Sequence, residues 1–122
     1  MSPRHLTAGI FGAIAIALGA FGAHGLKAQW ALLPEGLTWW QTATHYLLIH
    51  AVVLAAVPLP SVARWQCPAS YWVPGSVIFS GTLYALALGA PRWLGMVTPL
   101  GGILLLVGWL VLAWQGGRGL LK

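Results

Sequence analysis

Four long apolar segments, rich in Ala, Leu, Ile and Val, alternate with short connections along the chain. They lie at about residues 6–26, 39–57, 72–90 and 98–115. Each approaches the ~20 apolar residues that an α-helix needs to cross the hydrocarbon core of a bilayer. The pattern therefore predicts an all-α integral membrane protein, a four-helix bundle that forms one transmembrane domain over residues 1–122.

Residues with special roles at helix ends refine these limits. Thr38 and Gln41 fit a capping box at the start of the second helix. Pro74 is expected in the first turn of the third helix, where its missing N–H costs little. Thr98 and Pro99 are expected as the N-cap and the first residue of the fourth helix. These positions are consistent with four separate helices.

Composition strengthens the membrane assignment and excludes several classes of protein. Hydrophobic residues make up 59 % of the chain and charged residues 6 %, against about 45–50 % and about 25 % in soluble domains. Six basic and one acidic side chain cannot cover a water-facing surface, so a soluble enzyme is excluded. The lone Cys67 excludes a disulfide scaffold. The basic residues include no run that would follow nucleic-acid phosphates, so the lipid bilayer is the expected partner and nucleic acid is not.

The distribution of basic residues predicts the orientation in the membrane. An even number of helices places both termini on one side. The N-terminus, the second connection and the C-terminus carry Arg4, Arg64, Arg118 and Lys122, whereas the first and third connections carry Lys27 and Arg92. Because basic residues accumulate on the cytoplasmic side, both termini are expected to be cytoplasmic.

Small residues in the first helix form a stripe along one face. They are Ala8, Gly12, Ala15, Gly19 and Gly22, which follow one another at steps of three or four. Such a stripe lets a second helix approach closely. We therefore interpret these residues as a helix-packing surface.

Polar side chains inside the predicted helices need partners, because an unpaired polar group in hydrocarbon costs several kcal/mol. Three roles are open for the histidines His24, His45 and His50. Their neutral imidazoles could form hydrogen bonds between helices, or they could relay protons or small molecules. They could also bind haem or a metal ion, with His24 and His50 as the candidate pair. Trp109 is also unusual, because the other tryptophans gather near the predicted helix ends.

The chain offers no combination of residues typical of catalysis. Glu35 is its only acidic residue, and it is expected to face water or to pair with Lys27. No Ser/His/Asp triad, paired carboxylates or Cys/His zinc spacing can be assembled. The sequence therefore predicts that the protein is not an enzyme and has no catalytic residues, no metal site and no cofactor, with haem as the one alternative.

Several motifs, taken in order, resemble those of a known family. They occupy residues 19–26, Thr42–Ala43 with Tyr46 and His50, and then residues 79–84, 92–95 and 98–102. Over roughly Leu6 to Trp114 they are similar to domain-of-unknown-function family 423, small membrane proteins that include bacterial YgdD and eukaryotic transmembrane protein 256. One departure is Thr82, where the family pattern has serine.

The resemblance implies a four-helix protein of the inner (plasma) membrane in a bacterium, and it implies no activity. The motif residues that it maps onto this chain are His24, His50, Ser80, Tyr84, Arg92, Thr98 and Pro99. We expect an intramembrane polar cluster made of His24, His45, His50, Ser80 and Tyr84. We expect Arg92 and Thr98 to form an interface or helix-end site.

Three functions are compatible with these features. The first is a structural or accessory subunit that packs against other membrane protein subunits, such as those of a respiratory or photosynthetic complex. The second is a small carrier or channel, formed by a homo-oligomer, whose His, Ser and Tyr side chains line a path. The third is a redox protein that binds haem or a quinone.

Overall fold

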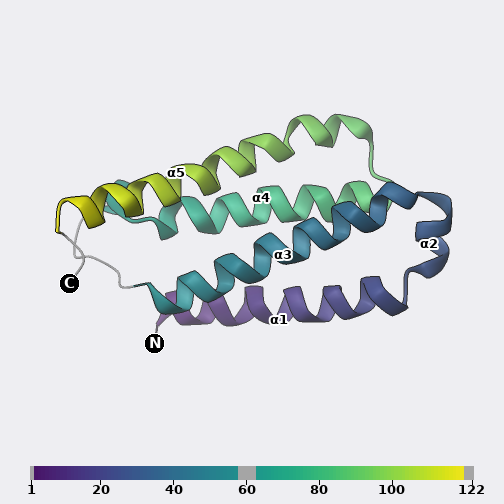
Figure 1. Cartoon of the computed structure of the whole chain (residues 1–122), viewed down its shortest axis with the longest axis horizontal. Coiled ribbons are helices and arrows are strands. Elements are labelled where there is room, and N and C mark those ends of the chain that lie inside the picture. Colours follow the sequence, from purple (N-terminus) through teal and green to yellow (C-terminus); the bar gives the residue numbers. More distant parts are fainter. Residues whose placement is uncertain (1, 58–62, 120–122) are drawn as a thin grey trace.

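The computed structural model describes residues 2–57 and 63–119, and its elements are all helical. Four long helices dominate: α1 (Pro3–His24), α3 (Pro34–Ala56), α4 (Ala69–Ala87) and α5 (Thr98–Gly117). Shorter helices lie in the connections, namely α2 (Lys27–Leu32) and the 3₁₀ helices η1 (Arg64–Gln66) and η2 (Arg92–Met96). The predicted all-α architecture with four main helices is confirmed (Figure 1).

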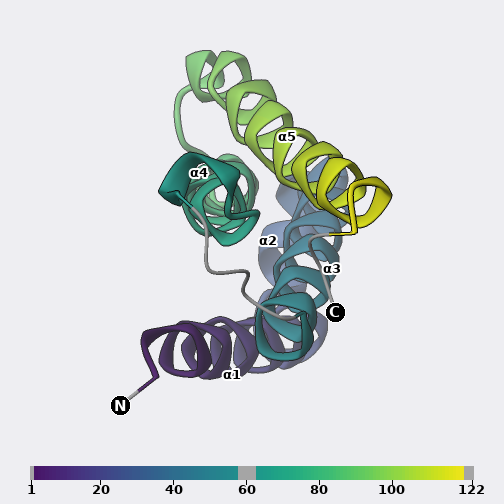
Figure 2. The same ribbon diagram turned by 90° about the vertical axis from the view of Figure 1, so that its left-hand side faces the viewer.

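Successive long helices run antiparallel to each other and pack together in chain order. α1 packs against α3, α3 against α4, and α4 against α5. Figure 1 shows α1 and α5 at opposite edges of the molecule, and Figure 2 shows the same order from one end. α1 and α4 begin, and α3 and α5 end, at the same end of the molecule.

Small residues set the register between α1 and α3. A Cβ added at Gly12 would lie 3.8 Å from the Cβ of Ala51, and one added at Gly19 would lie 3.1 Å from the Cγ2 of Thr44. At Gly22 the added atom would come within 2.2 Å of the Trp40 indole nitrogen. The two helices therefore meet closely where α1 lacks side chains.

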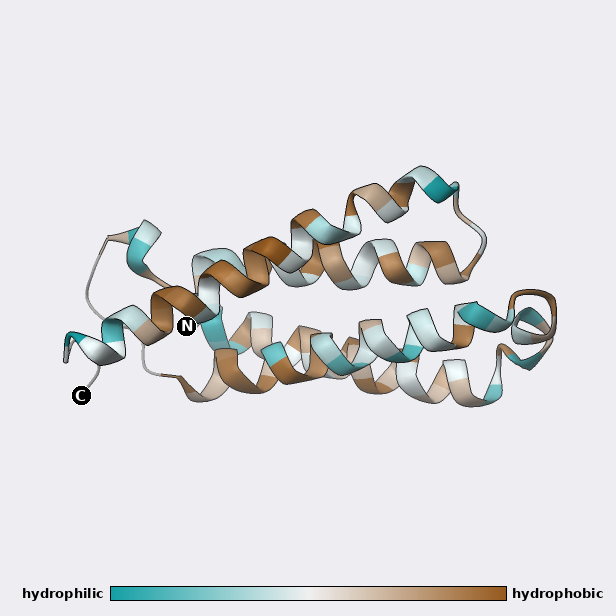
Figure 3. Cartoon of the chain, turned by 45° about the horizontal axis from the view of Figure 1, so that its top comes forward, coloured by the Kyte–Doolittle hydropathy of each residue, from teal (hydrophilic) through white to brown (hydrophobic). Residues whose placement is uncertain are grey.

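Two of the long segments are by themselves long and apolar enough to cross a membrane. They are Pro3–His24 and Arg92–Gly117, and Figure 3 shows hydrophobic residues along the middle of α5. α3 and α4 have similar lengths but carry more polar residues, including His50 and Ser80. These polar residues lower the mean hydropathy of both helices, which explains why hydropathy alone marks two spans rather than the four that we predicted.

Three expectations about helix ends are wrong. α3 begins at Pro34, which suits the first turn because its φ is already helical, so Thr38 lies inside the helix and does not form a capping box. α4 begins at Ala69 instead of residue 72, which places Pro74 inside the helix. Thr98 is the first residue of α5 rather than its N-cap, which is Val97.

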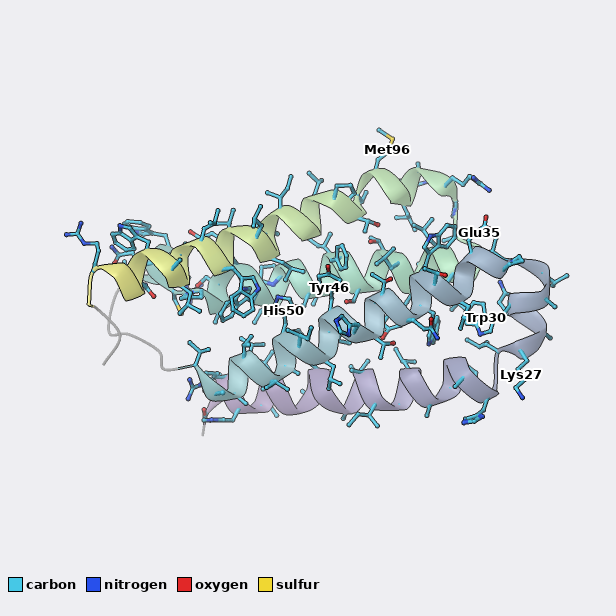
Figure 4. All side chains as sticks on the ribbon, viewed as in Figure 1. Lys27, Trp30, Glu35, Tyr46, His50 and Met96 are labelled. Atoms are coloured by element: carbon cyan, nitrogen blue, oxygen red, sulfur yellow. The ribbon has the colours of Figure 1, made fainter. Side chains whose placement is uncertain are left out.

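The first connection is ordered by side chains of α2. The indole of Trp30 donates a hydrogen bond to the carbonyl oxygen of Gly22 at 2.8 Å, and the Gln29 amide donates to the carbonyl oxygen of Ala87 at 3.1 Å. Lys27 and Glu35 lie apart in Figure 4, so the ion pair that we considered for them does not form. Glu35 instead lies exposed in the first turn of α3, where a negative charge is favourable.

Candidate functional site

Polar side chains form a row along the face of α4 that packs against α3. Its members are one helical turn apart, at Trp72, Ser76, Ser80 and Tyr84. All four are buried. A buried polar group in a membrane protein needs a partner, and among the described residues the Trp72 indole nitrogen and the Ser76 hydroxyl have none, whereas Ser80 and Tyr84 do.

His50 of α3 lies at one end of the row, 3 % exposed. Its Nε2 accepts a hydrogen bond from the Trp109 indole of α5 at 3.1 Å. Its Nδ1 lies 2.6 Å from the carbonyl oxygen of Tyr46 and therefore carries the ring proton. Both ring nitrogens are thus occupied, and the imidazole joins α3 to α5 (Figure 4).

Aromatic rings surround this imidazole. The ring centroid of His50 lies 6.1 Å from that of Trp72 and 5.9 Å from that of Trp109, and the two indoles are 4.9 Å apart. The indoles fit because Gly108 of α5 has no side chain. A Cβ there would lie 2.5 Å from Trp72. This part of the row is a close-packed contact among α3, α4 and α5.

Ser80 and Tyr84 bind different partners from His50. The Ser80 hydroxyl donates to the carbonyl oxygen of Ala43 in α3 at 2.8 Å. The Tyr84 hydroxyl lies 2.7 Å from the Thr44 hydroxyl. Trp40, whose ring lies 4.6 Å from that of Tyr84, donates its indole N–H to the carbonyl oxygen of Leu18 in α1 at 2.7 Å. These contacts link α1, α3 and α4.

The structure does not bring all the predicted cluster residues together. His24 lies exposed at the end of α1, and His45 lies exposed on α3. His45 is separated from His50 by about 140° around the helix at 100° per residue, so only His50 faces the interior. His50, Ser80 and Tyr84 thus form three separate hydrogen-bonded contacts, and the expectation of one cluster with His24 and His45 is wrong.

The prediction that His24 and His50 could bind one haem as a pair is also wrong. The contacts between α1 and α3 place His50 opposite about residue 13, eleven residues from His24. At 1.5 Å per residue this separates the two imidazoles by about 16 Å along the helices, too far for one iron ion. Within residues 2–57 and 63–119, no group of three or more His, Cys, Asp or Glu residues could hold a metal ion.

Arg92 and Thr98 lie in different surroundings. Arg92 is exposed in η2, whereas Thr98 is buried at the start of α5. The Thr98 hydroxyl lies 2.6 Å from that of Thr82 and donates to the carbonyl oxygen of Leu94. Thr98 therefore joins α5 to α4 through Thr82, the position at which this chain departs from the family pattern.

An open cavity of about 270 Å³ lies between α1 and α3. Gly19, Gly22 and Ala23 of α1 form one side, and Gln41 and His45 are among the residues of α3 that form the other. The small-residue stripe thus serves two surfaces: some of its members contact α3 directly, and some border this outward-facing cavity.

The sequence analysis did not include three partners of Tyr84 and His50 among the site residues. They are Thr44, Trp72 and Trp109. Trp109 carried a usable signal, because an indole N–H in the middle of a membrane helix needs an acceptor. Thr44 carried none, because threonine is common in helices of every environment.

Comparison with known proteins gives a consistent result. The family described as "Protein of unknown function (DUF423)" matches residues 18–102. The chain is 38 % identical over 120 residues to a UPF0382 membrane protein of Haemophilus influenzae, covering 93 % of this chain and 94 % of the relative. It is 39 % identical over 106 residues to the UPF0382 inner membrane protein YgdD of Escherichia coli, covering 84 % and 79 %. A UPF0382 membrane protein of Schizosaccharomyces pombe is 39 % identical over 110 residues, covering 84 % and 91 %. No solved structure matches the chain significantly.

Proposed function

The chain belongs to the DUF423 family of membrane proteins, and on that premise we propose that it is a non-catalytic accessory subunit that packs against a larger membrane complex. One observation carries this proposal. The buried polar side chains His50, Ser80 and Tyr84 bond to neighbouring helices, and the described cavities are lined by other residues on the outer faces. A fixed interior of this kind leaves the outer surface as the place for function.

The carrier hypothesis receives less support from the same geometry. A path along the row would pass His50, whose two ring nitrogens already bond to Tyr46 and Trp109. It would then pass Ser80, which bonds to the backbone of α3. Transport would require these bonds to break, whereas an accessory role uses them as they are.

The outer faces suit a role in assembly. α1 exposes Ile10 and Ile16, and α5 exposes Ile103 and Leu110, at opposite edges of the molecule. α1 packs mainly against α3, and α5 packs mainly against α4 and touches α3 at the Trp109–His50 bond, so much of the surface of each edge helix is open to lipid or to another subunit. A chain with little polar surface outside the membrane has few other ways to recognise a partner.

Purification from native membranes tests the accessory role. The tagged protein is extracted in a mild detergent, and co-purifying proteins are quantified by mass spectrometry beside a tagged membrane protein of similar size from another family. Stoichiometric recovery of subunits from one known complex is the expected result. Recovery of the chain alone, or only with copies of itself and lipid, would contradict the proposal and favour a self-contained carrier.

We propose a cytoplasmic location for both termini. The basis is that Arg4, Arg64 and Arg118 lie at the end of the molecule where α1 begins and α5 ends. Alkaline phosphatase is active only outside the cytoplasm, so fusions to either terminus are expected to be inactive and fusions after Lys27 active. The reverse pattern would overturn this orientation.

A further inference from the structure

A second cavity, of about 370 Å³, lies at the end of the molecule where α1 and α4 begin. Its polar lining comes from two arginines and two hydroxyl residues: Arg4 and Thr7 of α1, Arg64 of η1 and Ser70 at the start of α4. Its apolar lining includes Leu54 of α3 and Val73 of α4. The cavity therefore combines two positive charges, two hydroxyl groups and an apolar wall.

Within residues 2–57 and 63–119, neither arginine has an acidic side chain as a partner. Glu35 is the only acidic residue in the sequence, and it lies at the other end of the molecule, where α3 begins (Figure 4). Arg4 donates a hydrogen bond to the carbonyl oxygen of Val57 at the end of α3, and its second terminal nitrogen lies 3.5 Å from the Nε2 of His5. A guanidinium has five N–H groups, so Arg4 keeps donors for a further acceptor. An anion from outside the chain is the natural complement of this pair.

The apolar wall distinguishes between possible anions. A free phosphate ion would contact the arginines and hydroxyls but gain nothing from Leu54 or Val73. A phospholipid has a phosphate at the membrane surface and acyl chains that extend into the hydrocarbon core, so it matches both parts of the cavity. Basic pockets between membrane helices are known to hold anionic headgroups.

We propose that this cavity binds an anionic phospholipid. Arg4 and Arg64 contact the headgroup phosphate, and Thr7 and Ser70 supply further hydrogen bonds to it. Leu54 and Val73 contact the upper part of an acyl chain. The site does not depend on the accessory role, because a lipid can bind here whether or not another subunit packs against the chain.

Lipid titration of the full-length protein tests the proposal. The purified, delipidated protein in mild detergent is titrated with phosphatidylglycerol, and bound lipid is counted by native mass spectrometry. Arg4→Gln/Arg64→Gln is compared with Arg92→Gln/Arg118→Gln, which removes the same charge elsewhere. Phosphatidylcholine with the same acyl chains and inorganic phosphate are the comparison ligands.

We expect the wild type to prefer phosphatidylglycerol, and the Arg4/Arg64 variant to bind it roughly thirtyfold more weakly. The control variant should bind within about twofold of wild type, because both of its altered side chains lie outside the cavity. Arg4 also bonds to the end of α3, so the double variant could fail to fold. In that case Arg64→Gln alone is compared with Arg118→Gln. Its expected loss is roughly fivefold.

Three results would overturn the proposal. The first is equal affinity for phosphatidylglycerol and phosphatidylcholine. The second is an equal loss in the control variant, which would show only the effect of net charge. The third is displacement of bound phosphatidylglycerol by an equal concentration of inorganic phosphate, which would identify a free-anion site.

Discussion

Ser76 and Ser80 provide a matched test of how the interior holds the helices together. They lie one turn apart on the same face of α4, and they are 1 % and 2 % exposed. The Ser80 hydroxyl donates to the carbonyl oxygen of Ala43 at 2.8 Å. The Ser76 hydroxyl has no hydrogen-bond partner among residues 2–57 and 63–119. Replacing each with alanine removes the same atom from two nearly identical positions that differ in this one bond.

The expected changes in the free energy of unfolding have opposite signs. Ser80→Ala removes a hydrogen bond between membrane helices, which contributes about 0.6 kcal/mol on average and at most about 1.7 kcal/mol. We expect a loss of about 0.5–1.5 kcal/mol. Ser76→Ala removes a buried hydroxyl whose lost solvation costs about 1–3 kcal/mol. We therefore expect this variant to be unchanged or more stable than wild type.

Equilibrium unfolding in mixed micelles, followed by circular dichroism, measures both changes. The wild type and the two variants are titrated with increasing fractions of sodium dodecyl sulfate at fixed pH. Equal destabilisation by the two substitutions would refute the reasoning, because the loss would then come from packing and not from the hydrogen bond to Ala43. A larger loss for Ser76→Ala would show that this hydroxyl has a partner.

Two further matched pairs test the close contacts. Gly22→Ala is expected to lower stability by about 1–3 kcal/mol, because its Cβ would overlap an indole of α3. At Gly9 an added Cβ would have nothing within 4 Å, so Gly9→Ala should leave the same unfolding titration unchanged. Trp109→Phe is expected to lower stability by about 1–2 kcal/mol, because it leaves the Nε2 of His50 without its donor. The exposed Trp114→Phe should change the unfolding midpoint little, and an equal loss in both variants would argue against the imidazole–indole bond.

The helices were predictable because their signals are long and redundant. Segments of about twenty mostly apolar residues leave few alternatives in a chain with this composition. The starts of α3 and α4 were placed three to five residues too late. Pro34 and Ala69 begin these helices, but the apolar pattern becomes strong only further along the chain. Hydropathy reports where a helix enters hydrocarbon, and a helix can begin before that point.

The partners of the polar residues were harder to predict than the residues themselves. Helical periodicity places Ser76, Ser80 and Tyr84 on one face of α4, and the structure keeps them there. Periodicity cannot specify which residue of a neighbouring helix lies opposite. That depends on the register between helices, which at the α1–α3 contact is set by glycines and the indole of Trp40. The contacts of Tyr84 with Thr44 and of His50 with Trp109 were therefore invisible in the sequence.

The arrangement of polar groups bears directly on where this protein acts. An interior built for transport would need acceptors and donors free to bind cargo, yet His50, Ser80 and Tyr84 each bond to a neighbouring helix or side chain. Arg4 and Arg64, by contrast, border an open cavity and have no acidic side-chain partner in the part of the chain that the structure describes. Three buried polar residues therefore hold helices together, whereas the two arginines border an open cavity at the surface. This division is consistent with our proposals that the protein acts through what binds its outer faces, whether lipid or another subunit.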